Sequence, residues 1–261
     1  MELYKYPNSP YMDFSPGKDN ADKTTNAYLD IIKSSFVITE KLDDNNAPLS
    51  KKGVHQKSDV INTTSNAFAT KTYDLWNRIY NDIDDGIIIC GGNMYAVHSI
   101  EYTGLTSHYY IFGIFDENTN TWLSWSDTEY YANYLNIPTV PVLYRHDKHI
   151  HFSHDMLIKV INELMSVPSK LSDDRFRLVK SPSIYDSSIV LNDKLNTNLY
   201  QTPKEGIVLR NDDSFLHENF NANLVKYVRA HHVQTDKHWT KMWRKSKLVS
   251  QLDNELIKSG K

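Results

Sequence analysis

Residues 36–43 read FVITEKLD, an apolar run that ends in charged residues. The aromatic and β-branched side chains at its start predict a β-strand. Because side chains two positions apart in an extended chain lie on one face, Lys41 and Asp43 are expected to point into the same space. A lysine in such a place can act as a nucleophile when nearby cations or a bound metal lower its pKa well below about 10.4. Taken alone, Lys-x-Asp is more often a solvated surface pair.

The segments around this strand predict strands that come one after another rather than alternating with helices. Further strands are expected at 86–90, 95–102, 109–115, 121–125, 206–209 and 224–228. Helices are expected at 25–34, at 65–83, after the N-cap candidate Ser153, and in a basic tail from about 235. This order favours an α+β fold with antiparallel sheets and flanking helices over a doubly wound parallel sheet. Residues 1–261 contain no repeat or long linker, so one domain is expected.

Composition narrows the classes of protein that this chain can belong to. With 40% hydrophobic and 12% aromatic residues, the chain can bury a large core, which excludes wholesale disorder. The single cysteine, Cys90, excludes an internal disulfide and a multi-cysteine metal site, and the net charge of −3 identifies no partner. No apolar stretch approaches the roughly 18 residues of a membrane span, and residues 1–17 do not resemble a secretion signal. An intracellular protein is therefore expected, with the cytoplasm as its first-choice compartment.

Five segments carry a more specific signal, and their order matters. They are 41–46 (KLDDNN), 90–100 (CGGNMYAVHSI), 110–116 (YIFGIFD), 204–210 (KEGIVLR) and 224–229 (LVKYVR), the last followed by 232–236 (HVQTD). In this order they resemble the motifs of ATP-dependent RNA ligases, which belong to the covalent nucleotidyltransferases together with DNA ligases and mRNA capping enzymes. The resemblance extends from about residue 4 to about residue 243 and implies the nucleotidyltransferase fold of ligases.

The resemblance implies a reaction and its cofactors. Lys41 would attack the α-phosphorus of ATP, release pyrophosphate and become a lysyl-AMP. The AMP would pass to an RNA 5′-phosphate, and a 3′-hydroxyl would then displace it and seal the strand. ATP and Mg²⁺ or Mn²⁺ are the implied cofactors, and RNA with nicked or broken ends is the implied partner. This chemistry depends on positioning and on positive charge around the phosphates.

The resemblance also implies roles for other residues. Glu205 would bind the metal or help to hold the nucleotide, and Phe112 would stack on adenine. The further implied nucleotide-binding residues are Asp43, Asn46, Lys57, Arg210, Lys226 and Arg229. Cations around the phosphates would lower the pKa of Lys41. Glu205 and Arg210 are five positions apart and would face opposite sides of an unbroken strand, unless a bulge at Gly206 reconciles them.

Four positions depart from the family's pattern. Asp44 stands where a glycine is usual, Lys57 replaces an arginine, and Gly113 occupies a position where some members carry an aspartate. Gly92 replaces the glutamate of Gly-Glu-Asn and removes a carboxylate that contacts the nucleotide sugar in the family. Glu101 or Asp43 are candidates to take over from it.

These departures leave two readings open, an active RNA ligase and a degenerate ligase fold that binds nucleotide or RNA without sealing. A DNA ligase or a capping guanylyltransferase is a third reading, which is disfavoured because no second, barrel-like domain is expected after Lys226. The tail places Trp239 and Trp243 on one helix face among basic residues. That face predicts either a helix that tracks phosphates or tryptophans packed on the domain.

Overall fold

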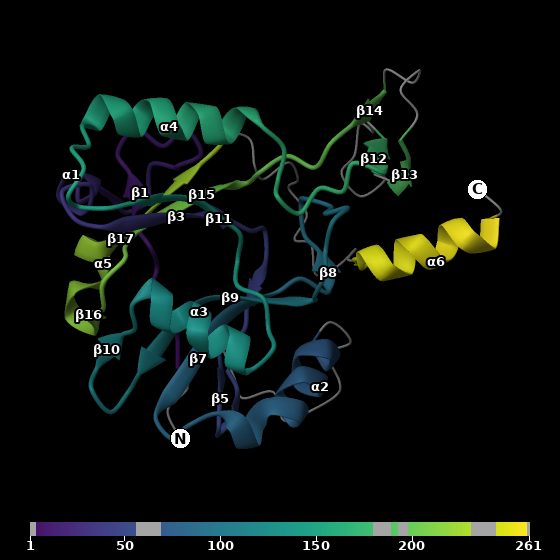
Figure 1. Ribbon diagram of the computed structural model, residues 1–261, viewed down its shortest axis with the longest axis horizontal. Helices are drawn as coiled ribbons and strands as arrows, with labels where there is room; N and C mark the ends of the chain where they lie inside the picture. The colour runs from purple at the N-terminus through teal and green to yellow at the C-terminus, as the bar shows by residue number, and fades with distance from the viewer. Residues whose placement is uncertain (1–3, 56–68, 180–188, 193–197, 231–243, 260–261) are drawn as a thin grey trace.

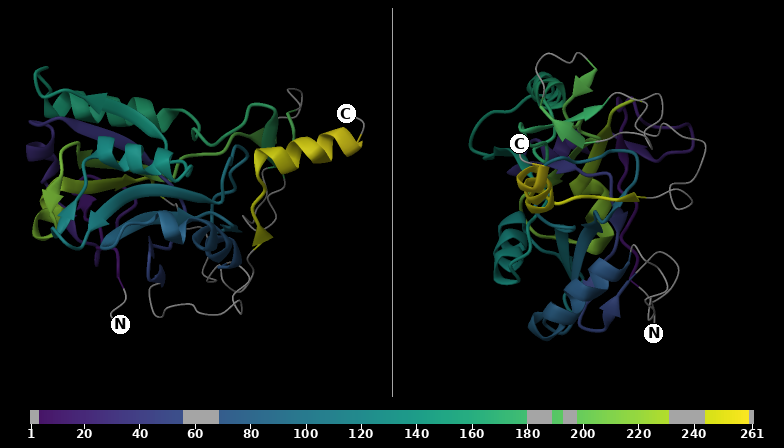
Figure 2. Two further views of the ribbon diagram at one scale, coloured as in Figure 1. Left: turned by 60° about the horizontal axis from the view of Figure 1, so that its bottom comes forward. Right: turned by 90° about the vertical axis from the view of Figure 1, so that its right-hand side faces the viewer.

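The computed structural model describes residues 4–55, 69–179, 189–192, 198–230 and 244–259. Two large β-sheets form its centre (Figure 1). Helix α4 (His154–Ser166) lies over one sheet, and α2 (Thr70–Ile79) and α3 (Trp125–Tyr134) lie beside the other. Figure 2 shows α6 (Val249–Ser259) projecting beyond the two sheets.

The first large sheet has six strands in the order β11-β3-β15-β17-β1-β2. Their bounds are Val142–His146 (β11), Phe36–Lys41 (β3), Gly206–Asn211 (β15), Leu224–Val228 (β17), Tyr11–Met12 (β1) and Thr24–Thr25 (β2). Neighbours are antiparallel from β11 to β17, whereas β1 runs parallel to β17 and to β2. The strand that ends in the candidate nucleophile therefore lies inside its sheet, between β11 and β15.

Because side chains alternate along β3, its two faces pack against different parts of the protein. Phe36 and Ile38 pack with Leu157 of α4 in one hydrophobic core. Val37, on the other face, packs with Trp125 of α3 in a second core. Because alternate residues of a strand share a face, the lysine at the end of β3 lies on the side of Val37, away from α4.

The second large sheet has the strand order β16-β10-β9-β7-β5-β6, with β4 also paired to β7, and all of its pairings are antiparallel. The bounds are Phe215–Leu216 (β16), Thr121–Trp122 (β10), Tyr109–Asp116 (β9), Ile87–Asn93 (β7), Leu49–Ser50 (β5), Gly53–Val54 (β6) and Asn45–Asn46 (β4). Leu75 and Ile79 of α2 and Ala132 of α3 pack with Ile89 and Ile114 of this sheet.

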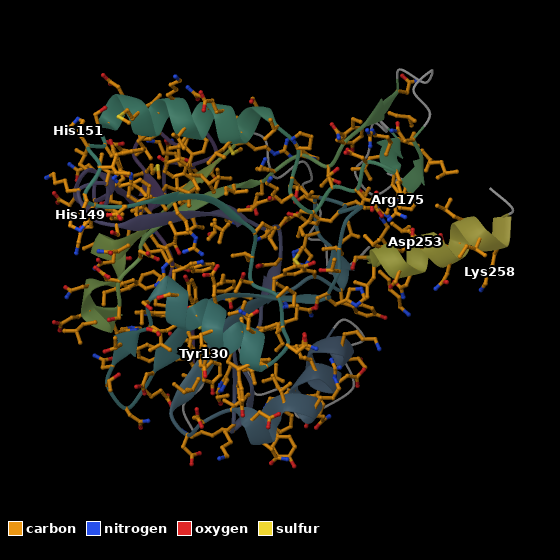
Figure 3. All side chains as sticks on the ribbon, viewed as in Figure 1. Tyr130, His149, His151, Arg175, Asp253 and Lys258 are labelled. Atoms are coloured by element: carbon orange, nitrogen blue, oxygen red, sulfur yellow. The ribbon has the colours of Figure 1, made fainter. Side chains whose placement is uncertain are left out.

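Smaller elements complete the fold. They are β12 (Phe176–Val179), β13 (Ile189–Leu191) and β14 (Leu199–Tyr200) in one antiparallel sheet, β8 (Ala96–Val97) paired with β18 (Arg244–Lys245), the helices α1 (Tyr28–Ile31) and α5 (Phe220–Asn223), and the 3₁₀ turns Tyr80–Asp82 and His217–Asn219. Figure 3 shows Arg175 beside Asp253, and their ion pair of 2.5 Å joins the start of β12 to α6.

The predicted α+β class with antiparallel sheets is confirmed, but several element predictions are wrong. The expected strand at 121–125 ends at Trp122 and is followed by α3, which the sequence reading missed. Ser124 begins that helix because its Oγ accepts a hydrogen bond from the backbone N–H of Asp127 at 3.0 Å. Of the strand expected at 95–102, only β8 is extended and paired.

The helix expected at 25–34 is limited to α1. The first part of the helix expected at 65–83 and most of the expected basic tail, including Trp239 and Trp243, lie outside the described residues. The strand β18 and then α6 come after that gap. In the part of the chain that the structure describes, no helix is long and apolar enough to span a membrane.

A buried lysine connects α4 to the strand that carries the candidate site. Lys204 precedes β15, and its Nζ donates hydrogen bonds to the carbonyl oxygens of Leu164, Val167 and Pro168 at 2.9, 2.8 and 2.6 Å. The last carbonyls of a helix lack partners within the helix and favour a positive charge nearby. Lys204 therefore fixes the C-terminal end of α4 against the start of β15.

Replacing this lysine is expected to destabilise the fold. Lys204→Met keeps the aliphatic stem but leaves the three carbonyls without their donor, and a lost hydrogen bond to a charged group costs about 1.5–3 kcal/mol. Urea unfolding should show a loss in that range. The control Lys159→Met removes a lysine of α4 whose side chain is 78% exposed, and it should change the free energy of unfolding by less than about 0.5 kcal/mol. Equal effects of the two changes would contradict this role.

Candidate active site

A cavity of about 360 Å³ lies between the inner faces of the two large sheets and the N-terminal segment 4–9. Its walls come from β3, β15 and β17 of the first sheet, β4 and β9 of the second, and residues next to them. Five residues that the sequence singled out line it: Lys41, Asn46, Phe112, Arg210 and Lys226. Segments that are far apart in the chain therefore meet at one place.

The register of the first sheet explains which side chains meet there. Thr39 pairs with Val208 and Val208 with Lys226, so these three residues share a face. Lys41 and Arg210 lie two positions from Thr39 and Val208 and share that face too. Apolar residues of the same strands point the other way, into the core under α4.

Lys41, which lines the cavity, is paired with a buried carboxylate. Its Nζ lies 2.6 and 2.7 Å from the two carboxylate oxygens of Glu205. Burial disfavours the ammonium, but Glu205, Asp44 and Asp43 outweigh burial and raise the pKa of Lys41. The lowering of this pKa by cations around a bound nucleotide stays a prediction, and in the structure itself the carboxylates dominate. Burial raises the pKa of Glu205 to about 7, although the charge of Lys41 opposes the shift.

Glu205 reaches the amine of Lys41 without a bulge in β15. Gly206 pairs with Lys41 and Arg210 pairs with Val37 in an uninterrupted ladder, so β15 is regular throughout. Glu205 precedes the strand, and the alternation of faces does not constrain its side chain. The bulge suggested at Gly206 is therefore absent: Arg210 lines the cavity through the alternation of β15, and Glu205, before the strand, contacts Lys41.

Lys226 and Arg210 are the other cations of the cavity, and burial affects both. Burial, with a smaller contribution from the charge of Lys41, lowers the pKa of Lys226 to about 8, and its Nζ lies 3.9 Å from the ring centre of Tyr11. Burial lowers the pKa of Arg210 to about 10. The guanidinium of Arg210 donates to the backbone oxygen of Leu123 at 2.7 Å. Arg210 therefore also ties the two layers together.

Aromatic side chains form part of the cavity wall. Phe112 meets the ring of Tyr6 edge to face, with 4.9 Å between the ring centres. Tyr4 and Tyr6 belong to the N-terminal arm and line the cavity, which the sequence reading missed because it treated this arm only as an extended segment. Nothing in the local sequence pairs these tyrosines with a site. The Oδ1 atom of Asn46 is buried and has no hydrogen-bond partner among the described residues.

Of the predicted site residues that the structure describes, Asp43, Glu205 and Arg229 do not line this cavity. Asp43 accepts hydrogen bonds from Ser99 N, Ser99 Oγ and Ile100 N at 2.7, 2.9 and 2.7 Å, so its carboxylate holds the 99–100 backbone. The expectation that it shares a face with Lys41 is not met because β3 ends at Lys41. Lys57 lies outside the described residues. Arg229 lines a second cavity, of about 450 Å³.

Neither candidate substitute for the missing glutamate faces the nucleophile. Glu101 is buried and forms an ion pair with Arg244. Asp43 is held by the backbone N–H groups of Ser99 and Ile100. Both carboxylates are thus committed to contacts away from the main cavity.

Comparisons with known proteins identify a family for this chain. The sequence matches the RNA ligase family over residues 34–228. No match to a curated protein is found.

Among solved structures, the chain is similar to a Naegleria gruberi RNA ligase with pyrophosphate (17% identity, 87% of this chain, 61% of that chain, TM-score 0.48). It is also similar to an archaeal ATP-dependent RNA ligase (12% identity, 86% and 48%, TM-score 0.48) and to an Aquifex aeolicus protein assigned as an ATP-dependent DNA ligase (15% identity, 87% and 50%, TM-score 0.48). The chain thus spans 48–61% of the length of these structures. Because the family match covers most of the sequence, this chain belongs to the RNA ligase family.

Proposed function

We propose that this protein is an ATP-dependent RNA ligase in which Lys41 becomes adenylylated. The observation that carries the proposal is the cavity in which the amine of Lys41 lies against Glu205 and shares its walls with Lys226. A volume of about 360 Å³ is within the range of small-molecule sites. Membership of the RNA ligase family supports RNA as the substrate that receives the AMP.

In the first step, Lys41 Nζ loses a proton and attacks the α-phosphorus of ATP. A nitrogen–phosphorus bond forms, the bond from the α-phosphorus to the bridging oxygen breaks, and pyrophosphate leaves. An RNA 5′-phosphate oxygen then attacks the same phosphorus and frees Lys41. Finally, a 3′-hydroxyl attacks the RNA 5′-phosphorus, AMP leaves, and a phosphodiester remains. Lys226 would balance phosphate charge during these steps.

Glu205 fits the part of a metal ligand. Mg²⁺ and Mn²⁺ prefer carboxylate oxygens and commonly take substrate phosphates and water as their other ligands. Among the described residues, no group of three or more His, Cys, Asp or Glu side chains is gathered for a metal, so phosphates would complete the set. A cation held there would neutralise charge on the phosphate under attack. Glu205 also orients the amine of Lys41 through its two short contacts.

Transfer of label tests the proposal directly. The purified protein is incubated with Mg²⁺ or Mn²⁺ and either α-labelled or γ-labelled ATP, then denatured and separated by electrophoresis. Label is expected on the protein from α-labelled ATP only, and it should leave when RNA with a 5′-phosphate is added. Joining of that RNA to a 3′-hydroxyl end completes the test, with DNA ends as the comparison.

The degenerate ligase fold predicts a different result. A folded protein that takes up no label yet is stabilised by ATP or RNA would support binding without sealing, and it would contradict the proposed reaction. Label without joining would retain Lys41 as the nucleophile but remove RNA sealing from the proposal.

Lys226 predicts a dependence of nucleotide affinity on pH. Its folded pKa of about 8 lies below the usual 10.5, so its positive charge is lost as the pH rises through about 8. Phosphate binding that needs this charge should weaken, and the dissociation constant for a non-hydrolysable ATP analogue should rise roughly fivefold from pH 8 to pH 9. Lys226→Arg should move the weakening to higher pH, because an arginine stays protonated. An unchanged pH profile in Lys226→Arg would contradict this assignment.

A further inference from the structure

Asp44 and Gly92 lie against one another across two paired strands. β4 pairs with β7 so that Asn46 lies opposite Gly92. Asp44 comes two positions before Asn46 in the chain. A Cβ atom added at Gly92 would lie 2.7 Å from Asp44 Cβ and closer still to its Cγ and Oδ2, inside the distance of any real Cβ contact. An aspartate at 44 and any side chain at 92 therefore exclude each other in this arrangement.

The same two positions depart from the family's pattern in opposite directions. Position 44 gains a carboxylate where a glycine is usual, and position 92 has a glycine where a glutamate is usual. Since the two positions share one small volume, the pair still contains one glycine and one carboxylate. The carboxylate has moved from β7 to the residue before β4, and its place next to the nucleophile is retained.

Asp44 has the properties of a ligand-facing acceptor. It lines the main cavity together with Lys41 and Asn46. Burial raises the pKa of its carboxyl to about 7, the charge of Lys41 opposes that shift, and no hydrogen-bond donor among the described residues contributes. Lys41 is hydrogen bonded to Glu205 instead. When ionised, this carboxylate accepts hydrogen bonds, and a ligand in the cavity can supply the donor.

The neighbouring amide adds a second acceptor to the same wall. Asn46 Oδ1 is buried without a hydrogen-bond partner in the described part of the chain. Unpaired buried acceptors are costly, and a ligand that brings hydroxyl or amine donors relieves that cost. Under the proposed function, the ligand is ATP, whose donors are the ribose hydroxyls and the adenine amine, and labelling from deoxynucleotides distinguishes the two.

We propose that Asp44 accepts a hydrogen bond from a ribose hydroxyl of the bound nucleotide, and that Gly92 is required because it leaves room for Asp44. This inference rests on the proposed function and adds a specificity-determining residue to that site. Asp44 thus supplies the carboxylate that Gly92 lacks, in place of Glu101 and Asp43, which are bound elsewhere. The glycine and the aspartate then act as one unit.

Deoxynucleotides test the ribose contact. Wild-type protein and Asp44→Ala are each labelled from ATP, 2′-deoxy-ATP and 3′-deoxy-ATP. The wild type should prefer ATP over at least one deoxy analogue by roughly 10- to 100-fold, the range for a lost hydrogen bond to a charged acceptor. Asp44→Ala should lose most of this preference because its labelling from ATP falls while labelling from that analogue changes little. An unchanged preference in Asp44→Ala would overturn the proposal.

The double variant Asp44→Gly, Gly92→Glu tests whether the carboxylate can be moved from position 44 to position 92. Gly92→Glu alone should label poorly from every nucleotide, since its side chain collides with Asp44. Adding Asp44→Gly should restore at least tenfold of the labelling from ATP, together with the preference for ribose. A double variant no better than Gly92→Glu would show that the two positions do not substitute for one another.

Melting temperatures test the close packing without any catalysis. Gly92→Ala should lower the melting temperature, and Asp44→Ala should reverse most of that loss in the double variant. Gly113→Ala is the matched control, because a Cβ there would lie at an ordinary 3.5 Å from Trp122. Equal effects of Gly92→Ala and Gly113→Ala would overturn the claim that Gly92 is needed to leave room for Asp44.

A failure of the proposed function gives a distinct pattern. If the wild type takes up no label, the ligase reaction is wrong, and the rise in melting temperature with ATP against the deoxy analogues still tests Asp44. A larger rise with ATP that disappears in Asp44→Ala would support the ribose contact in a protein that only binds nucleotide. Equal rises with all three nucleotides would overturn it.

Discussion

Lys41→Ala is expected to abolish covalent labelling from α-labelled ATP. The variant loses the nitrogen that forms the bond to phosphorus, and no other lysine takes the place of Lys41 beside Glu205 in the described cavity. Removing a covalent nucleophile typically lowers catalysis by several orders of magnitude, so label should fall below detection. Electrophoresis after denaturation measures the protein-bound label, and circular dichroism checks that the variant is folded.

A matched lysine shows whether the loss is specific. Lys33→Ala removes a lysine between α1 and β3. The side chain of Lys33 is 72% exposed and forms a surface ion pair with Asp30. That variant should label as well as the wild type. Label on folded Lys41→Ala equal to that on Lys33→Ala would place the nucleophile elsewhere and end the proposed mechanism. Joining of RNA that already carries a 5′-adenylate should survive in Lys41→Ala better than joining from ATP, because the last step does not use the lysine.

Glu205→Gln is expected to lower adenylylation by roughly 100- to 1,000-fold, the size of effect seen when one electrostatic contact to a reacting group is removed. The glutamine keeps the size of the side chain but cannot balance a divalent cation or the ammonium of Lys41. The structure predicts a second consequence. Because Glu205 contributes to the raised pKa of Lys41, its neutralisation should lower that pKa.

The pH profile separates this role from a structural one. In Glu205→Gln, the rise of the adenylylation rate with pH should move to lower pH, while the maximal rate falls. The concentration of Mg²⁺ or Mn²⁺ needed for half-maximal rate should increase as well. Glu163→Gln, on the exposed side of α4, is the control and should change neither quantity. A lower rate with an unchanged pH profile and an unchanged metal requirement would assign Glu205 to packing alone.

The contacts of the aspartate pair change how this site is understood. Asp43 and Asp44 are adjacent, yet the first binds the backbone at Ser99 and Ile100 and the second lines the cavity beside Lys41. The Lys-x-Asp spacing in the sequence pointed to Asp43, whereas its neighbour Asp44 lines the cavity. Two of the departures that suggested a degenerate site, Asp44 and Gly92, occupy one space.

Much of the fold can be predicted from local sequence. The alternation of buried and cavity-facing residues in β3 comes from a period of two, and Ser153 begins α4 as its side chain predicts, with Oγ accepting from Met156 N at 3.2 Å. The order of the five motif segments is likewise a property of the sequence. Helix α3 was missed although Ser124 and Asp127 form a recognisable N-cap, because the aromatic residues before it read as a strand.

The sequence by itself therefore determined the family, the antiparallel strand class and the lysine at the end of β3, all of which depend on spacing along the chain. Only the tertiary structure decided that the ring of Tyr6 packs against Phe112 in the cavity wall. It also decided that Glu205 raises the pKa of Lys41 against the effect of burial, and that Asp44 fills the space next to Gly92. The physical reason is that these relations are set by packing distance and desolvation between residues far apart in the chain. Periodicity and motif spacing carry no information about such distances until the two sheets are brought together.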